Sequence, residues 1–478
     1  MSYQVSKHID KDKIFIVKRS EIKGRLEPEF YQPSLVSLEK RICKLAVHRL
    51  KDYALYMAGG ATPKKTEADK FYADSETGIP FLRVQNLQTN GELSLEDCVY
   101  INEETHSGLL ERSQVAEGDL LVKITGVGRM AIASVAPKGF VGNTNQHMVV
   151  IKTGDSALSK YLARYLNLDF IEKIASRHST GGTRPALDYP SLKNIPIIEG
   201  IDFSIIDHAI AIKKQKELDA QQMIDNIDSY LLDKLSISIK ERKEELKSKM
   251  FFIRRNILEQ RFDPLYYYAD IKKYTHCTYS EKLSSLAFSF TNGFAVGRQD
   301  QVEEGEGILQ IRPTNIDNNG QLKYDRNVYV PEMKDIPFVE SGVVLFNNTN
   351  SQEWVGKTAY FANEENWKVY ISNHITTIEV DRSKILPEYL CAILNMYQRH
   401  KIFYSICTNW NNQSGVGLDL LKSLYIPLFT SDRKESLRKQ QEIVDKIKAI
   451  YQEADECIFS ATQVMSEAKA KVESMIVG

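Results

Sequence analysis

Residues 202–250 read DFSIIDHAIAIKKQKELDAQQMIDNIDSYLLDKLSISIKERKEELKSKM, and this stretch decides the fold. It contains neither Gly nor Pro, so it predicts one long helix over residues 202–250. Apolar residues recur at helical spacing at Phe203, Ile206, Ile210, Ala220, Ile224, Ile227 and Leu231. Such a heptad seam is stable only when a partner helix covers it. Lys213 and Glu217 interrupt the seam, and they either set its register against the partner or lie exposed.

The overall composition indicates a globular protein of several domains. A chain of 478 residues is long enough for about two to four domains. The first residues lack an apolar signal segment and no later run is long enough to cross a bilayer, so we expect a cytoplasmic protein without a membrane segment. Its six cysteines form no CxxC pair, which argues against a zinc site and against a disulfide framework.

The charge balance restricts how the chain could bind nucleic acid. Its formal net charge is −1, whereas most nucleic-acid binders carry a strongly basic face. If DNA is the ligand, we therefore expect partner proteins to share the contacts to the phosphates.

The sequence after the central stretch repeats the sequence before it. RLEPEFY at 25–31 is echoed by RFDPLYY at 261–267, and GIPFLRVQNLQTNGEL at 78–93 by GILQIRPTNIDNNGQL at 307–322. The segment LDYPSLKNIPI at 187–197 is matched by LDLLKSLYIPL at 418–428. Within the first copy, residues 120–124, 131–135 and 148–151 predict buried strands, and residues 159–174 predict a helix. Ordered matches of this kind indicate an internal duplication.

A second long helix is predicted after the second copy, over residues 432–478. Asp432 is a candidate N-cap with Glu435 three residues later, and no Gly or Pro follows before Gly478. Its apolar seam comprises Ile443, Ile447, Ile450, Ala454, Cys457, Ala461, Val464 and Ala468. Two separate amphipathic helices, each lying on its own domain, are the simpler alternative. Two long helices after equivalent domains pair more naturally with each other.

The predicted fold is therefore of the α+β class. It has two similar mixed αβ modules, each followed by a long helix, and the two helices pair as an antiparallel coiled coil. The predicted domains are residues 1–201, 202–250, 251–431 and 432–478. The residues expected to pair the helices are Ile206, Ile210, Ile224, Ile227 and Leu231, with Ile443, Ile447, Ile450 and Val464.

No catalytic or cofactor motif survives inspection. GKT at 356–358 lacks the first glycine of a P-loop, and GVG at 126–128 lacks the third glycine of a dinucleotide fingerprint. His147 and His374 occupy comparable places in the two copies but have no second ligand at metal-binding spacing. No tetrapeptide of the Asn-Pro-Pro-Tyr type and no nuclease carboxylate cluster is present. We expect a chain that is not an enzyme and that holds neither a metal nor a cofactor.

Polar loop residues that can read base edges are the remaining candidates, because Asn and Gln pair with adenine, and Arg and Lys with guanine. The first copy offers Arg83, Asn86, Lys123, Arg129, Thr144, Asn145, Gln146, Ser179, Thr180, Thr183 and Arg184. The second offers Arg312, Asn315, Asn348, Asn350, Gln352, Asn373, Asn411, Asn412, Gln413 and Ser414. Each of them has a turn-forming or solvated role as its alternative. The pairs shared by both copies alternatively hold the fold, so the loops that differ are the better candidates for sequence reading.

Two similar αβ modules, each followed by a long helix, resemble the specificity subunit of type I restriction-modification systems. The resemblance covers nearly the whole chain. Its marks are GIPFLRVQNL and GILQIRPTNI, VAEGDLLVKITG at 115–126, residues 145–147, and LKNIPI or LKSLYIPL before each long helix. The second copy departs from it at FVESGVVLFNN, residues 338–348, where Val343 stands in place of Asp119 and must change the hydrogen bonds of that turn.

The resemblance implies a role and a set of partners. Each module would be a target recognition domain that binds one half of a bipartite site in double-stranded DNA. The long helices would set the gap between the halves and dock two methyltransferase (modification) subunits. Those subunits would carry S-adenosylmethionine for N6-adenine methylation, and restriction/translocase subunits would use ATP and Mg. A two-module protein-binding scaffold, or a specificity factor of a different methylation or phage-defence complex, is the alternative interpretation.

Overall fold

The computed structural model describes residues 10–22, 24–237, 252–255, 258, 262–268, 279–410 and 413–478. The chain divides into two compact units, one formed by Met1–Lys216 with Phe459–Gly478 and the other by Glu217–Ile458. Each unit contains one copy of the duplicated sequence together with parts of both long helices, α7 (Ser204–Lys234) and α14 (Arg433–Val477). None of the described helices is long and apolar enough to span a bilayer.

Unit 1 is a mixed αβ module. Its strands are β1 (His48–Arg49), β2 (Tyr56–Gly59), β3 (Tyr72–Ala73), β4 (Ile79–Leu82), β5 (Val99–Ile101), β6 (Gln114–Ala116), β7 (Leu120–Lys123), β8 (Ala133–Val135), β9 (Val141–Thr144), β10 (Met148–Lys152) and β11 (Pro196–Ile197). Its helices before α7 are α1 (Pro28–Tyr31), α2 (Pro33–Leu45), α3 (Ala68–Phe71), α4 (Ser156–Leu166), α5 (Asp169–His178) and α6 (Tyr189–Lys193). The strands form sheets of order β2-β10-β7-β8 and β3-β5-β4-β9-β6, with β1 paired to β11.

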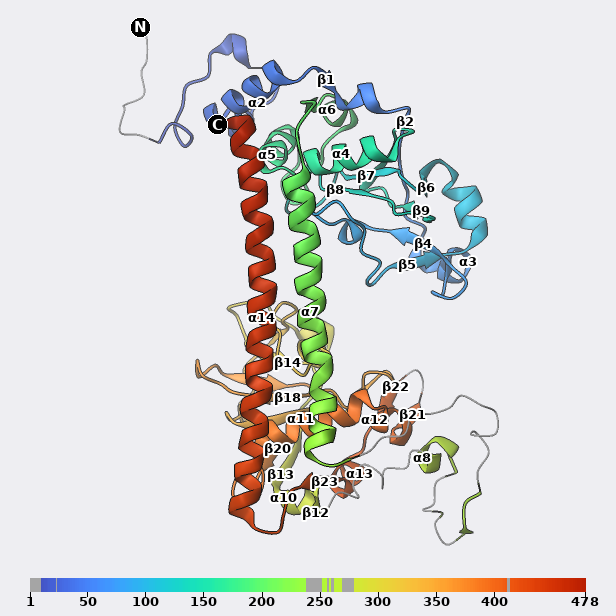
Figure 1. Cartoon of the computed structure of the whole chain (residues 1–478), viewed down its shortest axis with the longest axis vertical. Coiled ribbons are helices and arrows are strands. Elements are labelled where there is room, and N and C mark those ends of the chain that lie inside the picture. The colour runs from blue at the N-terminus through green and yellow to red at the C-terminus, as the bar shows by residue number, and fades with distance from the viewer. Residues whose placement is uncertain are drawn as a thin grey trace. The chain divides into compact units, whose positions relative to one another are not determined.

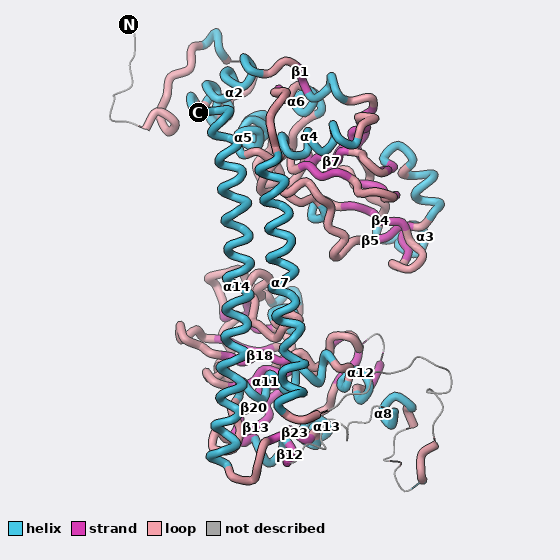
Figure 2. Tube along the Cα trace, viewed as in Figure 1, coloured by secondary structure: helices cyan, strands magenta, loops and turns pink. Residues whose placement is uncertain are grey.

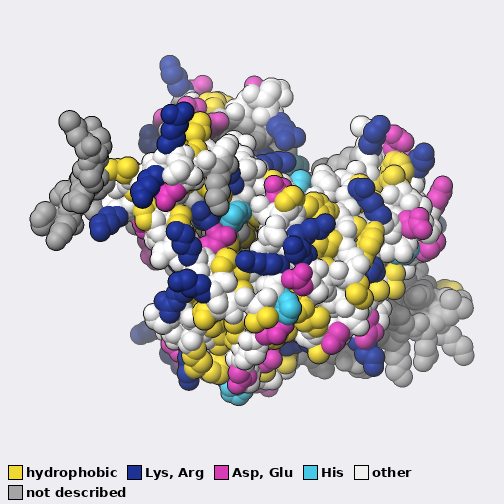
Figure 3. Space-filling model, turned by 90° about the horizontal axis from the view of Figure 1, so that it is seen from above, with side chains coloured by type: hydrophobic (Ala, Val, Ile, Leu, Met, Phe, Trp, Pro, Cys, Tyr) yellow, Lys and Arg dark blue, Asp and Glu magenta, His cyan; other side chains and the backbone are white. Residues whose placement is uncertain are grey.

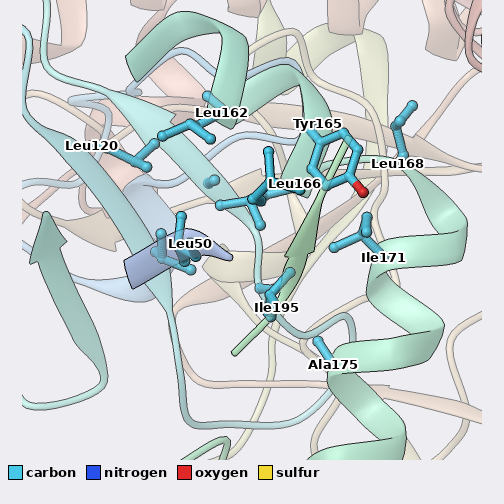
Figure 4. Close-up of a cluster of buried hydrophobic side chains, with 14 of the residues drawn as sticks. Leu50, Leu120, Leu162, Tyr165, Leu166, Leu168, Ile171, Ala175 and Ile195 are labelled. Atoms are coloured by element: carbon cyan, nitrogen blue, oxygen red, sulfur yellow. The ribbon is translucent and has the colours of Figure 1, made fainter. Parts of the chain in front are cut away.

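The main core of unit 1 lies where α4 covers β7 and β8 of the four-stranded sheet (Figure 2). Leu120, Leu162 and Leu166 are fully buried there, and Figure 4 shows Leu120 close to Leu162, with Leu166 between this pair and Ile171 of α5. Fully burying a side chain of this kind contributes on the order of 1.5 to 3 kcal/mol. The buried strands predicted at 120–124, 131–135 and 148–151 are confirmed as β7, β8 and β10.

The N-terminal segment RLEPEFY is fixed on the C-terminal end of α5. Arg25 donates hydrogen bonds to the carbonyls of His178 and Ser179, at 3.1 and 2.8 Å. The ring of Phe30 lies between two guanidinium groups, because Arg25 and Arg177 each approach its centroid at 4.5 Å. Cations placed at a helix C-terminus and over an aromatic face are both favourable. The segment therefore belongs to the module that follows it.

Unit 2 repeats this plan. Its strands are β12 (Tyr279–Lys282), β13 (Ala287–Asn292), β14 (Ile308–Ile311), β15 (Tyr329–Val330), β16 (Val343–Asn347), β17 (Thr349–Asn350), β18 (Thr358–Phe361), β19 (Val369–Ile371), β20 (Ile375–Val380), β21 (Thr408–Trp410), β22 (Gln413–Gly415) and β23 (Tyr425–Leu428). Its helices before α14 include α8 (Pro264–Tyr268), α10 (Leu283–Leu286), α11 (Pro387–Arg399), α12 (Ile402–Ile406) and α13 (Leu418–Ser423). The sheets have the orders β13-β20-β16-β18, β15-β14-β19, β17-β22-β21 and β12-β23.

The two copies share topology and individual hydrogen bonds. The antiparallel order β2-β10-β7-β8 of unit 1 matches β13-β20-β16-β18 of unit 2, and the parallel pair β4-β9 matches β14-β19. In unit 1 the buried side chain of Asn167 bonds both the N–H and the carbonyl of Ala133. In unit 2 the Asn395 side chain bonds Thr358 in the same way. The internal duplication predicted from the sequence is confirmed.

Asn167 also divides a predicted helix. The pattern over 159–174 predicts one helix, but the structure has two, because α4 ends at Leu166 and α5 begins at Asp169. The amide of Asn167 pairs with strand β8 at this point, and Arg129 donates to the Asn167 carbonyl at 2.6 Å. The bond from Arg129 satisfies a backbone carbonyl that a continuous helix would have used.

The central helix is shorter than predicted, since α7 ends at Lys234 and not near residue 250. Ser236 has a positive φ of 55°, and its N–H donates to the carbonyl of Asp233. The N–H of Ile237 donates to Leu232, and the Ile237 side chain is buried. This is a Schellman motif, which usually carries glycine at the left-handed position, so serine gave no stop signal. The predicted helical residues 238–250 lie outside the described residues.

The second long helix is confirmed as α14, and its Asp432 cap is confirmed as well. The Asp432 carboxylate accepts from the N–H groups of Lys434 and Glu435, at 2.9 and 3.2 Å. In each unit, α7 and α14 lie side by side (Figure 1) and contribute to one core. In unit 1 the pairing residues are Ile206 and Ile210 with Val464, and in unit 2 they are Ile224, Ile227 and Leu231 with Ile443, Ile447 and Ile450. The start of α7 thus shares a core with the end of α14, and its end with the start of α14, so the pairing is antiparallel.

Candidate nucleic-acid interface

Two of the predicted base readers are buried framework residues. Asn86 and Asn315 are both fully buried. The Asn86 side chain accepts from the Arg83 N–H at 2.8 Å and donates to the Ser94 carbonyl at 2.9 Å. Asn315 makes the same pair of bonds, to Arg312 and Lys323. A side chain that is buried and hydrogen-bonded in this way cannot reach DNA, so the prediction is wrong for both, and their alternative role in the fold holds.

The arginines that precede them are engaged within the protein as well. Arg83 donates to the Asp97 carbonyl at 2.8 Å. Arg312 donates through Nε and one terminal nitrogen to the Gln310 side chain, and burial lowers the pKa of its guanidinium. Both side chains remain partly exposed. Their contact with DNA stays a prediction.

Three further candidates of the first copy support the fold. Lys123 is buried, its ammonium donates to the Val127 carbonyl at 2.7 Å, and burial lowers its pKa. Arg129 holds the Asp169 carboxylate at 2.5 Å at the start of α5. Thr144 is fully buried within β9. Lys123 and Thr144 are thus corrected from base readers to core residues, whereas Arg129 is partly exposed.

The loop at residues 179–184 differs in sequence from its counterpart in the second copy and is largely exposed in unit 1. Thr180, Thr183 and Arg184 are exposed, while Ser179 is half-buried and donates to the Ala175 carbonyl. Ala186 bridges to both Thr180 and Thr125, which places this loop beside the turn that follows β7. Gln146 is exposed and contacts Thr62, whereas Asn145 is buried and accepts from the N–H of His147.

The second copy builds a small sheet at the corresponding place. Thr349 and Thr408 both pair with Gly415, as Thr125 and Thr180 bridge to Ala186 in unit 1. The sheet β17-β22-β21 gathers several candidates: Asn350, which is half-buried; Gln413, which is exposed; and Ser414, which is buried and donates to Asn409 at 2.6 Å. Gln352 donates to the Tyr404 carbonyl at 2.9 Å. Asn411 and Asn412 lie outside the described residues.

A pocket of about 420 Å³, lined by several polar side chains, opens beside this sheet. Its lining includes Asn292, Asn348, Thr349, Asn373, Thr376 and Trp410. Asn348 is buried and donates to Thr376 Oγ1 at 2.9 Å, and Thr376 in turn donates to Asn292 at 2.6 Å. The Asn373 side chain is exposed, and its amide group makes no hydrogen bond to the residues that the structure describes, whereas the Asn373 backbone N–H donates to the Phe294 carbonyl at 3.1 Å. Two candidates, Asn348 and Asn373, are therefore brought together in one pocket.

Sequence reasoning missed four of the six lining residues named above, Asn292, Thr349, Thr376 and Trp410. A signal was present for one of them, because a tryptophan within the polar loop TNWNNQSG is unusual for a solvated turn. Asn292 and Thr376 lie on neighbouring strands, β13 and β20, where they are paired. Only strand pairing brings them beside that loop.

The P-loop-like and histidine motifs have local explanations. Lys357 of the GKT sequence is buried, donates to the Ile316 carbonyl at 2.6 Å, and has a pKa lowered by burial. His147 and His374 occupy equivalent turns, as predicted, because their carbonyls accept from Ile124 and Asn348. Burial, assisted by nearby Arg312, lowers the pKa of His374. Within the described ranges, no three His, Cys, Asp or Glu side chains could hold a metal ion together.

Charges of both signs are mixed on the surface. On the face drawn in Figure 3, lysine and arginine side chains are interspersed among acidic and apolar ones. This mixture agrees with the formal net charge of −1. The fold and these loops together define a duplicated αβ protein with two different polar loop surfaces on one shared framework.

Comparison with known families identifies this class. A family model described as the type I restriction modification DNA specificity domain matches residues 44–199. The family model thus matches most of the first copy of the duplicated sequence. A chain described as the type I restriction enzyme MjaX specificity subunit of Methanocaldococcus jannaschii is 30% identical over 98 residues. That match covers 20% of this chain and about a quarter, 23%, of the relative.

Two solved structures that match most of the chain have lower sequence identity. A chain from a type I R-M system, studied for complex assembly and conformational transition, is 12% identical, covers 90% of this chain and 96% of its own, and has a TM-score of 0.46. The type I restriction-modification S subunit of M. genitalium is 13% identical, covers 89% and 95%, and has a TM-score of 0.35.

Proposed function

We propose that this chain is the DNA sequence-specificity subunit of a type I restriction-modification complex and that it has no catalytic residues of its own. In this proposal each module reads one half of a bipartite site in double-stranded DNA. The long helices set the gap between the halves and dock two methyltransferase subunits, and restriction/translocase subunits join the same complex. Those partner subunits bind and use S-adenosylmethionine, ATP and Mg.

One observation supports the proposal most strongly: the framework is duplicated but the loops on it differ. The hydrogen bonds of Asn86 and Asn167 in the first copy recur at Asn315 and Asn395 in the second. The residues that the two copies share are therefore explained by their role in the common fold. The loop at 179–184 and the sheet β17-β22-β21 occupy the same place with unrelated sequences. Two modules that read different half-sites need this combination. The side chains in the loops select which bases are recognised, whereas the shared framework positions each module on the DNA.

We further propose a division of the chain that follows this function. Residues 1–201 form the first target recognition domain, and residues 251–431 form the second. The spacer consists of residues 202–250, of which α7 covers Ser204–Lys234, and of residues 432–478, which contain α14.

The test is an exchange of residues 54–197 for the same segment of a relative with a different target. Methylated adenines are then mapped across the genome of cells that express the complex with each chain. We expect one half of the recognised sequence to change and the other half to stay. The matched control exchanges the segment for one from a relative with the same target, which leaves both halves unchanged. A change in both halves, or in neither, would contradict the division of labour.

A further inference from the structure

The pocket beside Trp410 is a feature of the second copy, and corresponding hydrogen bonds show which residues replace one another there. Ile124 donates its N–H to the His147 carbonyl at 2.9 Å in unit 1, and Asn348 donates to His374 at 3.0 Å in unit 2. An apolar position of the first copy is therefore a buried asparagine in the second. Burying an amide is costly unless it is hydrogen-bonded, so its presence calls for a reason beyond packing.

The neighbouring strands show the same change from apolar to polar. Val149 of β10 is paired with Gly59 of β2, whereas Thr376 of β20 is paired with Asn292 of β13 at the matching place. Three positions that are Ile, Val and Gly in the first copy are thus Asn, Thr and Asn in the second. They join in one chain of hydrogen bonds from Asn348 through Thr376 to Asn292. This network fixes the polar wall of the pocket.

The lining of the pocket also includes an aromatic ring. Trp410 is 46% exposed, although tryptophan usually lies mostly buried. Its ring packs against Gly415, where an added Cβ would lie 2.4 Å from the ring. The first copy has Ala186 at the position of Gly415. Glycine therefore leaves room for the Trp410 ring at the rim of the pocket.

The shape of the site decides which part of a nucleic acid can enter it. Stacked base pairs are recessed in the grooves of a duplex, so elements that read them must protrude. A concave pocket with an aromatic rim instead suits a base that has left the stack, because such a base stacks on the ring and presents its edge to polar groups. The exposed amide of Asn373 lines the same pocket and is available to pair with that edge.

We propose that this pocket of the second copy binds one unstacked nucleobase, which stacks on Trp410 while the Asn373 amide pairs with its edge. The proposal rests on the DNA-binding function proposed above. The network of Asn348, Thr376 and Asn292 acts as the positioning wall behind the base. The first copy, with Ile124 and Val149 at the matching positions, has no such pocket wall.

The test uses the fluorescence of Trp410 in the full chain. The chain has three tryptophans, so replacing Trp354 and Trp367 by Phe leaves Trp410 as the one tryptophan reporter. Short single-stranded deoxyoligonucleotides are titrated into this variant, and each is compared with the same oligonucleotide carrying an abasic site at every position. We expect quenching by the oligonucleotides that carry bases and none by the abasic ones. Equal quenching by both, or none by either, would overturn the proposal.

A second experiment distinguishes base stacking on Trp410 from general electrostatic attraction between the protein and the oligonucleotide. Dissociation constants of the same oligonucleotides are measured by anisotropy for the unchanged chain, Trp410→Ala and Trp410→Phe. Loss of stacking should weaken binding on the order of tenfold in Trp410→Ala, whereas Trp410→Phe should retain most of it. Trp367→Phe serves as the control and should bind like the unchanged chain. Equal binding by Trp410→Ala and the unchanged chain would refute the site.

Failure of this inference is distinguishable from failure of the proposed function. If Trp410 gives no base-dependent signal but the exchange of residues 54–197 still changes one half of the methylated sequence, the specificity function stands and the pocket does not bind a base. If the exchange changes neither half while the base-dependent quenching persists, the proposed function is wrong and the pocket is a base site of another system.

Discussion

At the residue scale, the same side chain supports the fold in both copies. Asn86 and Asn315 each join a strand end to a loop eight residues further along the chain, through one accepted and one donated hydrogen bond. Both amides are fully buried. Removing either side chain would leave a backbone N–H and a backbone carbonyl without these partners, and an unsatisfied group that is shielded from water costs about 1 to 3 kcal/mol.

Asn86→Ala should therefore lower the free energy of unfolding by roughly 2 kcal/mol or more, as measured by urea unfolding of the full chain. Gln85→Ala is the matched control, because Gln85 is the exposed neighbour of Asn86 and its loss should cost less than about 0.5 kcal/mol. Similar destabilisation by the two substitutions would contradict the framework role of Asn86.

Lys469 of α14 is the second residue with a measurable consequence. Burial lowers its pKa to about 8, and nearby Arg129 acts in the same direction. Its ammonium donates to the Thr89 carbonyl at 3.2 Å. Below pH 8 both the folded and the unfolded chain hold the proton, so folding bears the full cost of burying the charge. Between pH 8 and the usual pKa of lysine near 10.4, the unfolded chain binds more protons, and stability rises with pH.

Lys469→Met removes this charge, so the variant should melt at a higher temperature than the unchanged chain at pH 7. The difference should narrow as pH rises from 8 towards 10, which thermal melts across this range would measure. Lys471→Met, at an exposed position two residues away, should show no such narrowing. If the difference in melting temperature between Lys469→Met and the unchanged chain stays constant from pH 8 to pH 10, the charge of Lys469 is not the cause of the stability difference.

At the element scale, the end of α7 is set by a local motif. Ser236 holds the left-handed conformation in which the N–H of Ile237 reaches the carbonyl of Leu232. A residue with a Cβ is strained there, whereas glycine is not. The sequence contains neither Gly nor Pro from here to residue 250, which is why it predicted a longer helix.

Ser236→Gly should therefore stabilise unit 2 by up to about 1 kcal/mol, seen as a higher urea midpoint. Ser229→Gly is the matched control in the exposed interior of α7, where glycine should destabilise by about 0.5 kcal/mol. Destabilisation by both substitutions would show that the cap at Ser236 does not end the helix.

At the scale of the whole molecule, the chain passes from one unit to the other only twice. The first passage lies within α7, between Lys216 and Glu217, and the second lies within α14, between Ile458 and Phe459. Both connections between the units are therefore helical, and under the proposed function the lengths of α7 and α14 would set the gap between the half-sites.

Deleting residues 213–219 together with 455–461 removes one heptad from each helix and keeps the seam in register. Under the proposed function, both half-sites should persist and the unread gap should shorten by about three base pairs, because seven helical residues span roughly 10 Å. Genome-wide mapping of methylated adenines measures the gap. Deleting 213–219 alone shifts the register and should abolish methylation. An unchanged gap after the double deletion would exclude the helices as the spacer.

The sequence by itself determined the duplication, the two long helices and their antiparallel pairing. Repeats, heptad spacing and caps can all be recognised in the sequence without knowing which segments lie together in space. For example, α14 begins one residue after its predicted cap, Asp432. Only the tertiary structure decided which polar residues face solvent. Asn86 and Gln146 are both polar residues in loop-like sequence, yet one is fully buried and the other exposed, because neighbouring chain segments bury one and not the other. The pocket beside Trp410 likewise exists only because the tertiary fold brings residues 292, 348, 373 and 376 beside strand β21, which starts at Thr408.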